Sequence, residues 1–183
     1  MLNLVPQIVN ALPSLGAPPV LAAGGLSEGA HIAAFLSLGA AGVVVGTRFL
    51  FAEESQYSDV QKRAIIAAKS GSAVRSYVFD RLRGTTGWPA GTDGRGLAMP
   101  AVVAVESGAD IAQMKEEVAE GAKRGDPSSV ITWAGTGVGH PNRLQPAKVT
   151  TDYLRCFFYY KKRLTGHCDR ILCGNCMKML WHA

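Results

Sequence analysis

The first 70 residues alternate between helix-like and strand-like patterns of hydrophobic positions. Residues 5–12 are typical of the end of a helix, which Pro13 and Gly16 close. Two short apolar runs, at 19–23 and 42–45, indicate strands that are buried on both faces of a parallel sheet. Between the two runs, apolar residues recur at helical spacing. The order of strand, glycine turn, helix and strand therefore predicts an α/β fold.

The hydrophobic pattern is less regular in the second half of the chain. Ser58 indicates the cap of a further helix, which Gly71 stops. Residues 84–100 are dense in Gly, Pro and Thr, and they predict a loop. The clearest predicted helix covers 110–123, because acidic residues lead its apolar stripe and basic residues follow it. A last short strand is predicted at 130–134, before a run rich in glycine.

Composition changes abruptly near residue 147. The tail from that position holds seven basic and two acidic residues, which account for the whole net charge of +5. The basic character therefore belongs to the tail, and the rest of the chain lacks the excess charge typical of a nucleic-acid-binding domain. We expect a domain over 1–146, a divergent, basic, Cys-rich tail over 147–183 that is not native to the fold, and no nucleic-acid partner.

The cysteines of the tail allow two interpretations. Cys168, Cys173 and Cys176, with His167 and Cys156 nearby, have elements of a zinc site, because thiolates two residues apart can chelate one ion. A second well-spaced pair is missing, and the abrupt change of composition favours translated intron or out-of-frame sequence. We therefore predict no metal site.

Nothing in the sequence indicates a membrane protein or a secreted one. No apolar run approaches the roughly 20 residues that are needed to span a bilayer. The first residues lack a basic patch ahead of an apolar stretch, and they lack a cleavage-site pattern. With 48% hydrophobic and 18% charged residues, the composition is that of a folded globular protein. We expect a cytoplasmic protein with no membrane partner.

Two glycine turns are the feature that carries chemistry. Ala23, Gly24 and Gly25 end the first predicted strand, and Gly46 and Thr47 end the second, about one βα unit later. Glycine leaves backbone N–H groups uncovered, and each turn leads to a helix N-terminus, which favours an anion. In (β/α)8 barrels the loops after the last two strands form the usual phosphate site. The two turns together therefore predict phosphate binding, with the Thr47 hydroxyl as one more donor.

Other roles for these residues are also consistent with the sequence. The glycines could merely permit tight turns and close packing of helix on strand. Arg48, directly after the second turn, could contact phosphate, or it could form a surface ion pair with Glu53 or Glu54. Two glycine turns at a spacing of one βα unit favour phosphate binding over the purely structural role.

The turns lie within segments that resemble the nitronate monooxygenase (2-nitropropane dioxygenase) family. The likeness is carried by short segments at residues 19–25, 38–40, 46–49, 82–86, 93–95 and 133–139. The first three are nearly the same in the FMN-dependent enoyl-acyl-carrier-protein reductase, whereas the last three are closer to the nitronate enzymes. The resemblance covers roughly residues 1–146 and implies a partial (β/α)8 TIM barrel, with the last two βα units and a C-terminal helical and loop region.

The resemblance also implies a cofactor and a reaction. FMN would be the cofactor, its phosphate held by Ala23, Gly24, Gly25, Gly46 and Thr47, and the reaction would be oxidation of alkyl nitronates by dioxygen. The family's base is a histidine in an Ala-Gly-Gly-His stretch, which this chain does not contain. The four histidines of the chain, which do not match that motif, are His31, His140, His167 and His182. We therefore predict no catalytic residue in this chain.

A complete barrel of this kind takes about 250 residues, and only its last two clear strands are predicted here. We expect a truncated gene model, a pseudogene product or a split fragment, with impaired activity. Two rivals stand beside the nitronate reaction. One is an enzyme similar to the FMN-dependent enoyl reductase, and the other is a non-catalytic remnant.

Overall fold

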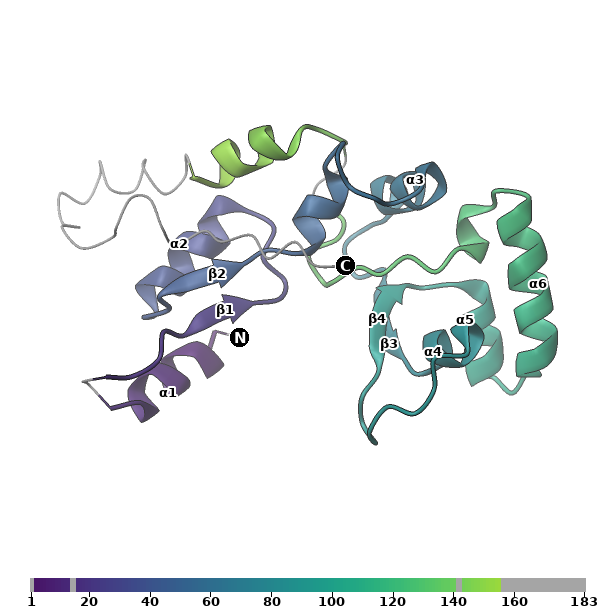
Figure 1. Cartoon of the computed structure of the whole chain (residues 1–183), viewed down its shortest axis with the longest axis horizontal. Coiled ribbons are helices and arrows are strands. Elements are labelled where there is room, and N and C mark those ends of the chain that lie inside the picture. The colour runs from purple at the N-terminus through teal and green to yellow at the C-terminus, as the bar shows by residue number, and fades with distance from the viewer. Residues whose placement is uncertain (1, 14–15, 141–142, 156–183) are drawn as a thin grey trace.

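The computed structural model of the protein describes residues 2–13, 16–140 and 143–155, which form two lobes (Figure 1). The first lobe contains α1 (Leu4–Ala11), β1 (Leu21–Ala23), α2 (Gly29–Ser37) and β2 (Gly42–Val44). The 3-10 helix η1 (Thr47–Phe51) and helix α3 (Asp59–Ala67) follow. The second lobe contains β3 (Ala73–Ser76), α4 (Val78–Arg83), β4 (Gly94–Leu97), α5 (Pro100–Glu106) and α6 (Ile111–Lys123). After the short η2 (Pro127–Ser129), the chain returns to the first lobe, where residues 147–155 are helical.

The first lobe is a two-stranded parallel sheet with helices packed on one face. β1 and β2 pair in the register Ala22 opposite Val43, and both residues belong to the core on the helical side. Val5 of α1 and Phe35 of α2 are buried in the same core. The predicted parallel α/β arrangement of this region is confirmed.

The other face of this sheet is open. Leu21 is 55% exposed and Val44 is 43% exposed, and Ala23, which pairs with Val44, is exposed as well. The prediction of strands buried on both faces is therefore wrong for this face. The apolar side chains are there, but no element of the described chain covers them.

The second lobe is built on an antiparallel pair, β3 and β4, with α4, α5 and α6 packed together around one core. The buried residues of that core are Val78, Phe79, Met99, Ala101, Val102, Val105 and Met114. Strand β4 lies inside the segment predicted to be a loop, so that prediction is wrong at 94–97. Glycine is needed in this strand because a Cβ at Gly94 would collide with the ring of Trp133.

Three predictions for the second half have clear outcomes. Ser58 caps α3 through a reciprocal capping box with Gln61. The Asp110 side chain caps α6, which ends at Lys123 as predicted. The strand predicted at 130–134 is reduced to one antiparallel bridge between Trp133 and Gly96.

The segment around residues 131–138 joins the two lobes. The Tyr57 hydroxyl donates to the carbonyl of Trp133 at 2.6 Å, and the Gln61 amide donates to the carbonyl of Ile131 at 3.0 Å. Val138, from the same segment, is buried against Phe51 and Ile65. The glycine-rich run at 135–139 is therefore held in a fixed place beside the first lobe.

Candidate functional site

The two predicted glycine turns lie side by side. Because β1 and β2 are parallel neighbours, their carboxyl ends, Ala23 and Val44, meet at one edge of the sheet. Gly24 and Gly25 follow the first strand with φ of 97° and 73°, a left-handed backbone that favours glycine. Gly46 follows the second strand with φ of −99°, in an ordinary conformation. The structure thus brings the predicted phosphate-binding residues together.

The helices that follow the two turns are not equivalent. The first turn leads to α2, whose N-cap residue Glu28 makes no side-chain cap. The second leads to η1, a 3-10 helix of five residues. The dipole of such a short helix is weak, so the expected helix N-terminus is fully present only after the first turn.

A third segment, at 135–137, covers the two turns and was not assigned to the site from the sequence. The backbone N–H of Gly135 donates to the Thr47 hydroxyl oxygen at 2.8 Å. A Cβ built on Gly25 would stand 2.9 Å from the hydroxyl oxygen of Thr136, and one on Gly137 would stand 3.6 Å from the Gly25 backbone. The sequence of this segment indicates only a family resemblance. Its contact with the turns depends on tertiary packing, which no local pattern predicts.

The turns present uncovered backbone to open space. No described atom lies within 4 Å of the place where a Cβ on Gly24 or Gly46 would stand. The Thr47 oxygen accepts from Gly135, so its own O–H remains available to donate. Backbone N–H groups and a free hydroxyl donor at one edge of a parallel sheet form a surface suited to an anion.

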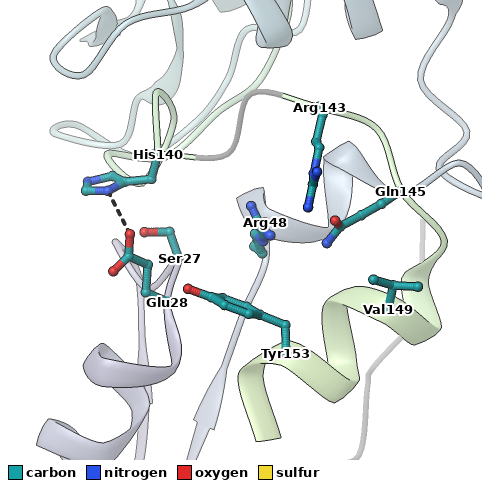
Figure 2. A pocket seen from close by; sticks show the side chains of 8 residues that line it. All are labelled: Ser27, Glu28, Arg48, His140, Arg143, Gln145, Val149 and Tyr153. Carbon is teal, nitrogen blue, oxygen red and sulfur yellow. Dashed lines mark ion pairs between the residues drawn. The ribbon is translucent and has the colours of Figure 1, made fainter. Parts of the chain in front are cut away.

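A cavity of about 320 Å³ lies beside these turns (Figure 2). Its lining residues are Ser27, Glu28, Arg48, His140, Arg143, Gln145, Val149 and Tyr153. The Arg48 guanidinium stands 5.7 Å from the centre of the Tyr153 ring, and it forms no ion pair with Glu53 or Glu54. Burial lowers the pKa of the Arg48 guanidinium, and neighbouring Arg143 acts in the same direction, whereas Tyr153 and Glu28 oppose the shift.

The described histidines are engaged in local contacts. Nδ1 of His31 accepts the backbone N–H of Ser27 at 3.2 Å. Nδ1 of His140 lies 3.4 Å from a carboxylate oxygen of Glu28, and the two imidazole rings meet edge to face at 6.0 Å. His167 and His182 lie outside the described residues.

Candidate metal sites and candidate membrane spans are absent from the part of the chain that the structure describes. There, no three His, Cys, Asp or Glu residues gather as metal ligands would. No helix in the same part has the length and apolarity to cross a membrane. The four cysteines all lie outside the described residues.

Comparison with known proteins gives consistent results. The family model for nitronate monooxygenase matches residues 1–150. The chain is 37% identical to nitronate monooxygenase npaC of Metarhizium robertsii, over 80% of this chain and 43% of that protein. It is 33% identical to the nitronate monooxygenase of Neurospora crassa, over 70% of this chain and 34% of that protein. The chain thus spans less than half the length of these curated relatives.

Solved structures agree with the sequence relatives. FabK from Thermotoga maritima superposes with a TM-score of 0.66 at 26% identity, over 91% of this chain and 51% of that chain. Nitroalkane oxidase from Streptomyces ansochromogenes superposes with a TM-score of 0.65 at 26% identity, over 89% of this chain and 44% of that chain. The chain belongs to the nitronate monooxygenase family.

Proposed function

We propose that this chain supplies the FMN-phosphate-binding part of a nitronate monooxygenase. The observation that carries the proposal is the pair of glycine turns at the carboxyl ends of adjacent parallel strands, with uncovered backbone at Gly24 and Gly46. When bound, FMN supplies the electron transfer for oxidation of an alkyl nitronate by dioxygen. The small-molecule substrate and dioxygen are therefore the partners of the reaction.

The residues present fit a phosphate group in three respects. Gly24 and Gly46 leave backbone N–H groups without a side chain over them, and Ala23 ends the strand that leads to the first turn. Beside Gly25 stands the hydroxyl of Thr136, which is a further possible donor. The Thr47 hydroxyl uses its oxygen to accept from Gly135, and its proton therefore remains available to donate to a ligand. Phosphate oxygens accept hydrogen bonds only, so a surface made of donors is complementary to them.

We further propose that the first lobe is part of a (β/α)8 barrel, containing its last two βα units. The exposed face formed by Leu21, Ala23 and Val44 supports this, because in a closed barrel that face points to an interior filled by side chains of the other strands. In this proposal residues 1–146 are the C-terminal part of the barrel and 147–183 are an added tail. Residues 147–155 nevertheless pack on the first part, since Leu154 is buried and the Ala147 N–H donates to Glu54 at 2.9 Å.

We assign no general base to this chain. His31 accepts a backbone N–H within its own helix region, and His140 pairs with Glu28 at the rim of the cavity. The base that removes or holds a substrate proton would come from outside the described residues. For this reason we expect weak turnover or none from the chain alone.

The proposal is tested by the FMN content of the purified 183-residue chain. The chain is saturated with FMN, freed of excess by gel filtration and denatured, and the released flavin is measured by fluorescence. About one FMN per chain is expected. A soluble, folded chain that retains none would overturn the proposed cofactor site and favour the non-catalytic remnant.

The rival flavin chemistry is separated by substrate. If the FMN-loaded chain has any activity, we expect oxygen consumption with an alkyl nitronate. Oxidation of a nicotinamide cofactor with an enoyl thioester would instead favour the enoyl-reductase-like enzyme, whose resemblance rests on segments 19–25, 38–40 and 46–49.

A further inference from the structure

The cavity beside the glycine turns has no part in the proposed function, yet two arginines line it. In the described chain Arg48 forms no hydrogen bond or ion pair, and its Nε atom is buried without a partner. Arg143 has no acidic partner there either. A guanidinium placed in a cavity without a carboxylate partner is an unsatisfied cation, which favours an anionic ligand.

The hydroxyl of Ser27 gives independent support. Ser27 is only 1% exposed, lines the same cavity, and has an Oγ atom with no hydrogen-bond partner. Buried hydroxyls are nearly always hydrogen-bonded, so an unused one is unusual. It lies at the start of α2, where the N-cap side chain of Glu28 leaves the first turn of the helix uncapped. The Ser27 hydroxyl and the guanidinium of Arg48 therefore line one space.

Glu28 is the one acidic side chain among the residues that line this cavity. Its carboxylate is directed toward His140, at 3.4 Å from Nδ1. Figure 2 shows this pair at one end of the cavity, while Arg48 and Arg143 lie toward the other. The negative charge of Glu28 is thus not paired with either arginine.

We propose that this cavity binds the phosphate group of a small molecule, at a site separate from the glycine turns. Guanidinium forks match the geometry of phosphate oxygens, and the Ser27 hydroxyl adds a further donor. At about 320 Å³ the cavity is larger than a phosphate ion. Val149 and the ring of Tyr153 line the remaining space and would face the organic part of such a ligand.

The glycine turns and the cavity are reached by different side chains. The Thr47 hydroxyl oxygen accepts the N–H of Gly135, whereas the guanidinium of its neighbour Arg48 stands over the ring of Tyr153. A Cβ built on Gly137 would stand 3.3 Å from the side chain of Ser27 and 3.6 Å from the backbone of Gly25. The cavity lining includes Ser27 and Arg48 but none of the turn residues Gly24, Gly25, Gly46 and Thr47, so a ligand in the cavity is not required to rest on the turns.

The test is a calorimetric titration of the full chain with inorganic phosphate, with sodium chloride holding the ionic strength constant. We expect saturable binding of one phosphate per chain in the cavity, beside the phosphate that the glycine turns hold in the FMN-free chain. Arg48→Gln and Ser27→Ala should each weaken it by about tenfold or more, because each removes a donor to a charged group. Arg63→Gln is the matched control, since this exposed arginine of α3 lies outside the cavity and its loss changes the net charge equally.

Ser27→Ala also separates a ligand role from a structural one. Because the hydroxyl has no partner in the folded chain, the variant should be at least as stable as the parent in phosphate-free buffer. Absence of saturable phosphate binding by the parent, or an equal loss in Arg63→Gln, would overturn the proposal.

A second titration identifies the source of the phosphate. Phosphate should bind equally well to the chain loaded with FMN, and Arg48→Gln should leave FMN binding unchanged. Displacement of phosphate by FMN, but not by riboflavin, would mean that the FMN phosphate itself enters the cavity, and the separate site would be rejected. If the chain holds no FMN at all, the titration with phosphate alone still decides the matter.

Discussion

Glycine is present in the two turns for different reasons. Gly24 and Gly25 have the positive φ that side chains rarely adopt, so the turn itself requires glycine there. Gly46 has φ of −99°, and no described atom stands within 4 Å of a Cβ built on it. The folded chain therefore gives no steric reason for glycine at position 46, and the FMN phosphate that we propose there would supply one.

Gly46→Ala should consequently reduce FMN retention without changing the fold. We expect a loss of about tenfold or more in FMN affinity, because a methyl group would separate the phosphate from the backbone donors. The free energy of unfolding in urea should change by no more than about 0.5 kcal/mol, as for a surface substitution. Unchanged FMN affinity in a folded Gly46→Ala chain would contradict the assignment of this turn.

Tyr57 makes stability depend on pH at the alkaline end. Its hydroxyl donates to the Trp133 carbonyl at 2.6 Å, and burial raises the pKa of Tyr57 to about 12. In the unfolded chain the phenol ionises near its ordinary pKa of about 10. The contribution of Tyr57 to stability is therefore complete below pH 10 and is lost as the pH rises toward 12.

The measurement is the free energy of unfolding in urea at intervals from pH 8 to pH 12, for the parent and for Tyr57→Phe. The difference between the two should shrink above about pH 10, because the variant has no phenol to ionise. At pH 8 the variant should be less stable by about 1 kcal/mol, since the Trp133 carbonyl loses its donor. A difference that stays constant across the range would show that Tyr57 ionises at the same pH in both states.

At the scale of elements, α3 depends on its first residue. Ser58 and Gln61 satisfy each other's backbone N–H groups at the start of the helix. Ser58→Ala should therefore lower the free energy of unfolding by about 1 kcal/mol. Ser58→Asp is the control, because a carboxylate caps equally well and should retain most of the stability. Equal losses in both variants, measured by urea unfolding, would argue against the capping box.

The sequence predicted those helix starts that depend on residues close together in the chain. The predicted cap at Ser58 and the acidic residues that lead the 110–123 stripe gave correct starts for α3 and α6, because both signals act within a few residues. Strand β4 was missed because its sequence, Gly-Arg-Gly-Leu, has neither apolar alternation nor β-branched residues. It is a strand only through its pairing with β3 and the close approach of Trp133.

The same division applies to the candidate site. The proximity of the two glycine turns followed from parallel strand order, which the sequence pattern indicates. The placement of 135–137 over those turns depends on contacts between residues about 88 positions apart, such as Gly135 and Thr47. No local pattern encodes such a contact, and the pairing of Arg48 with Tyr153 was missed for the same reason.

At the scale of the whole molecule, the open face of the β1–β2 sheet makes neighbouring residues differ sharply. Ala22 is 2% exposed under the helices, and Leu21 is 55% exposed on the other face. Leu21→Glu should change the free energy of unfolding by no more than about 0.5 kcal/mol, whereas Ala22→Glu should cost about 3 kcal/mol or more, because it buries an unpaired charge.

Urea unfolding of the two variants at several protein concentrations checks this expectation. If Leu21→Glu destabilised the chain as strongly as Ala22→Glu, then the open face would be covered in solution. A loss of stability that grew with protein concentration would indicate that the chains associate through that face. In a complete barrel, where the face is covered, Leu21→Glu should destabilise the fold as much as a core substitution does.

The hydrogen bond from Gly135 to Thr47 has a consequence for how the lobes move. Gly135 lies two residues after Trp133, which is bridged to Gly96 of the second lobe, while Thr47 belongs to the edge of the first. A ligand resting on the turns thus sits where the two lobes meet. If docking of the two lobes raises the affinity for that ligand by some factor, then binding of the ligand raises the equilibrium constant for docking by the same factor. The extent of cofactor binding and the rigidity between the lobes then depend on the same coupling free energy.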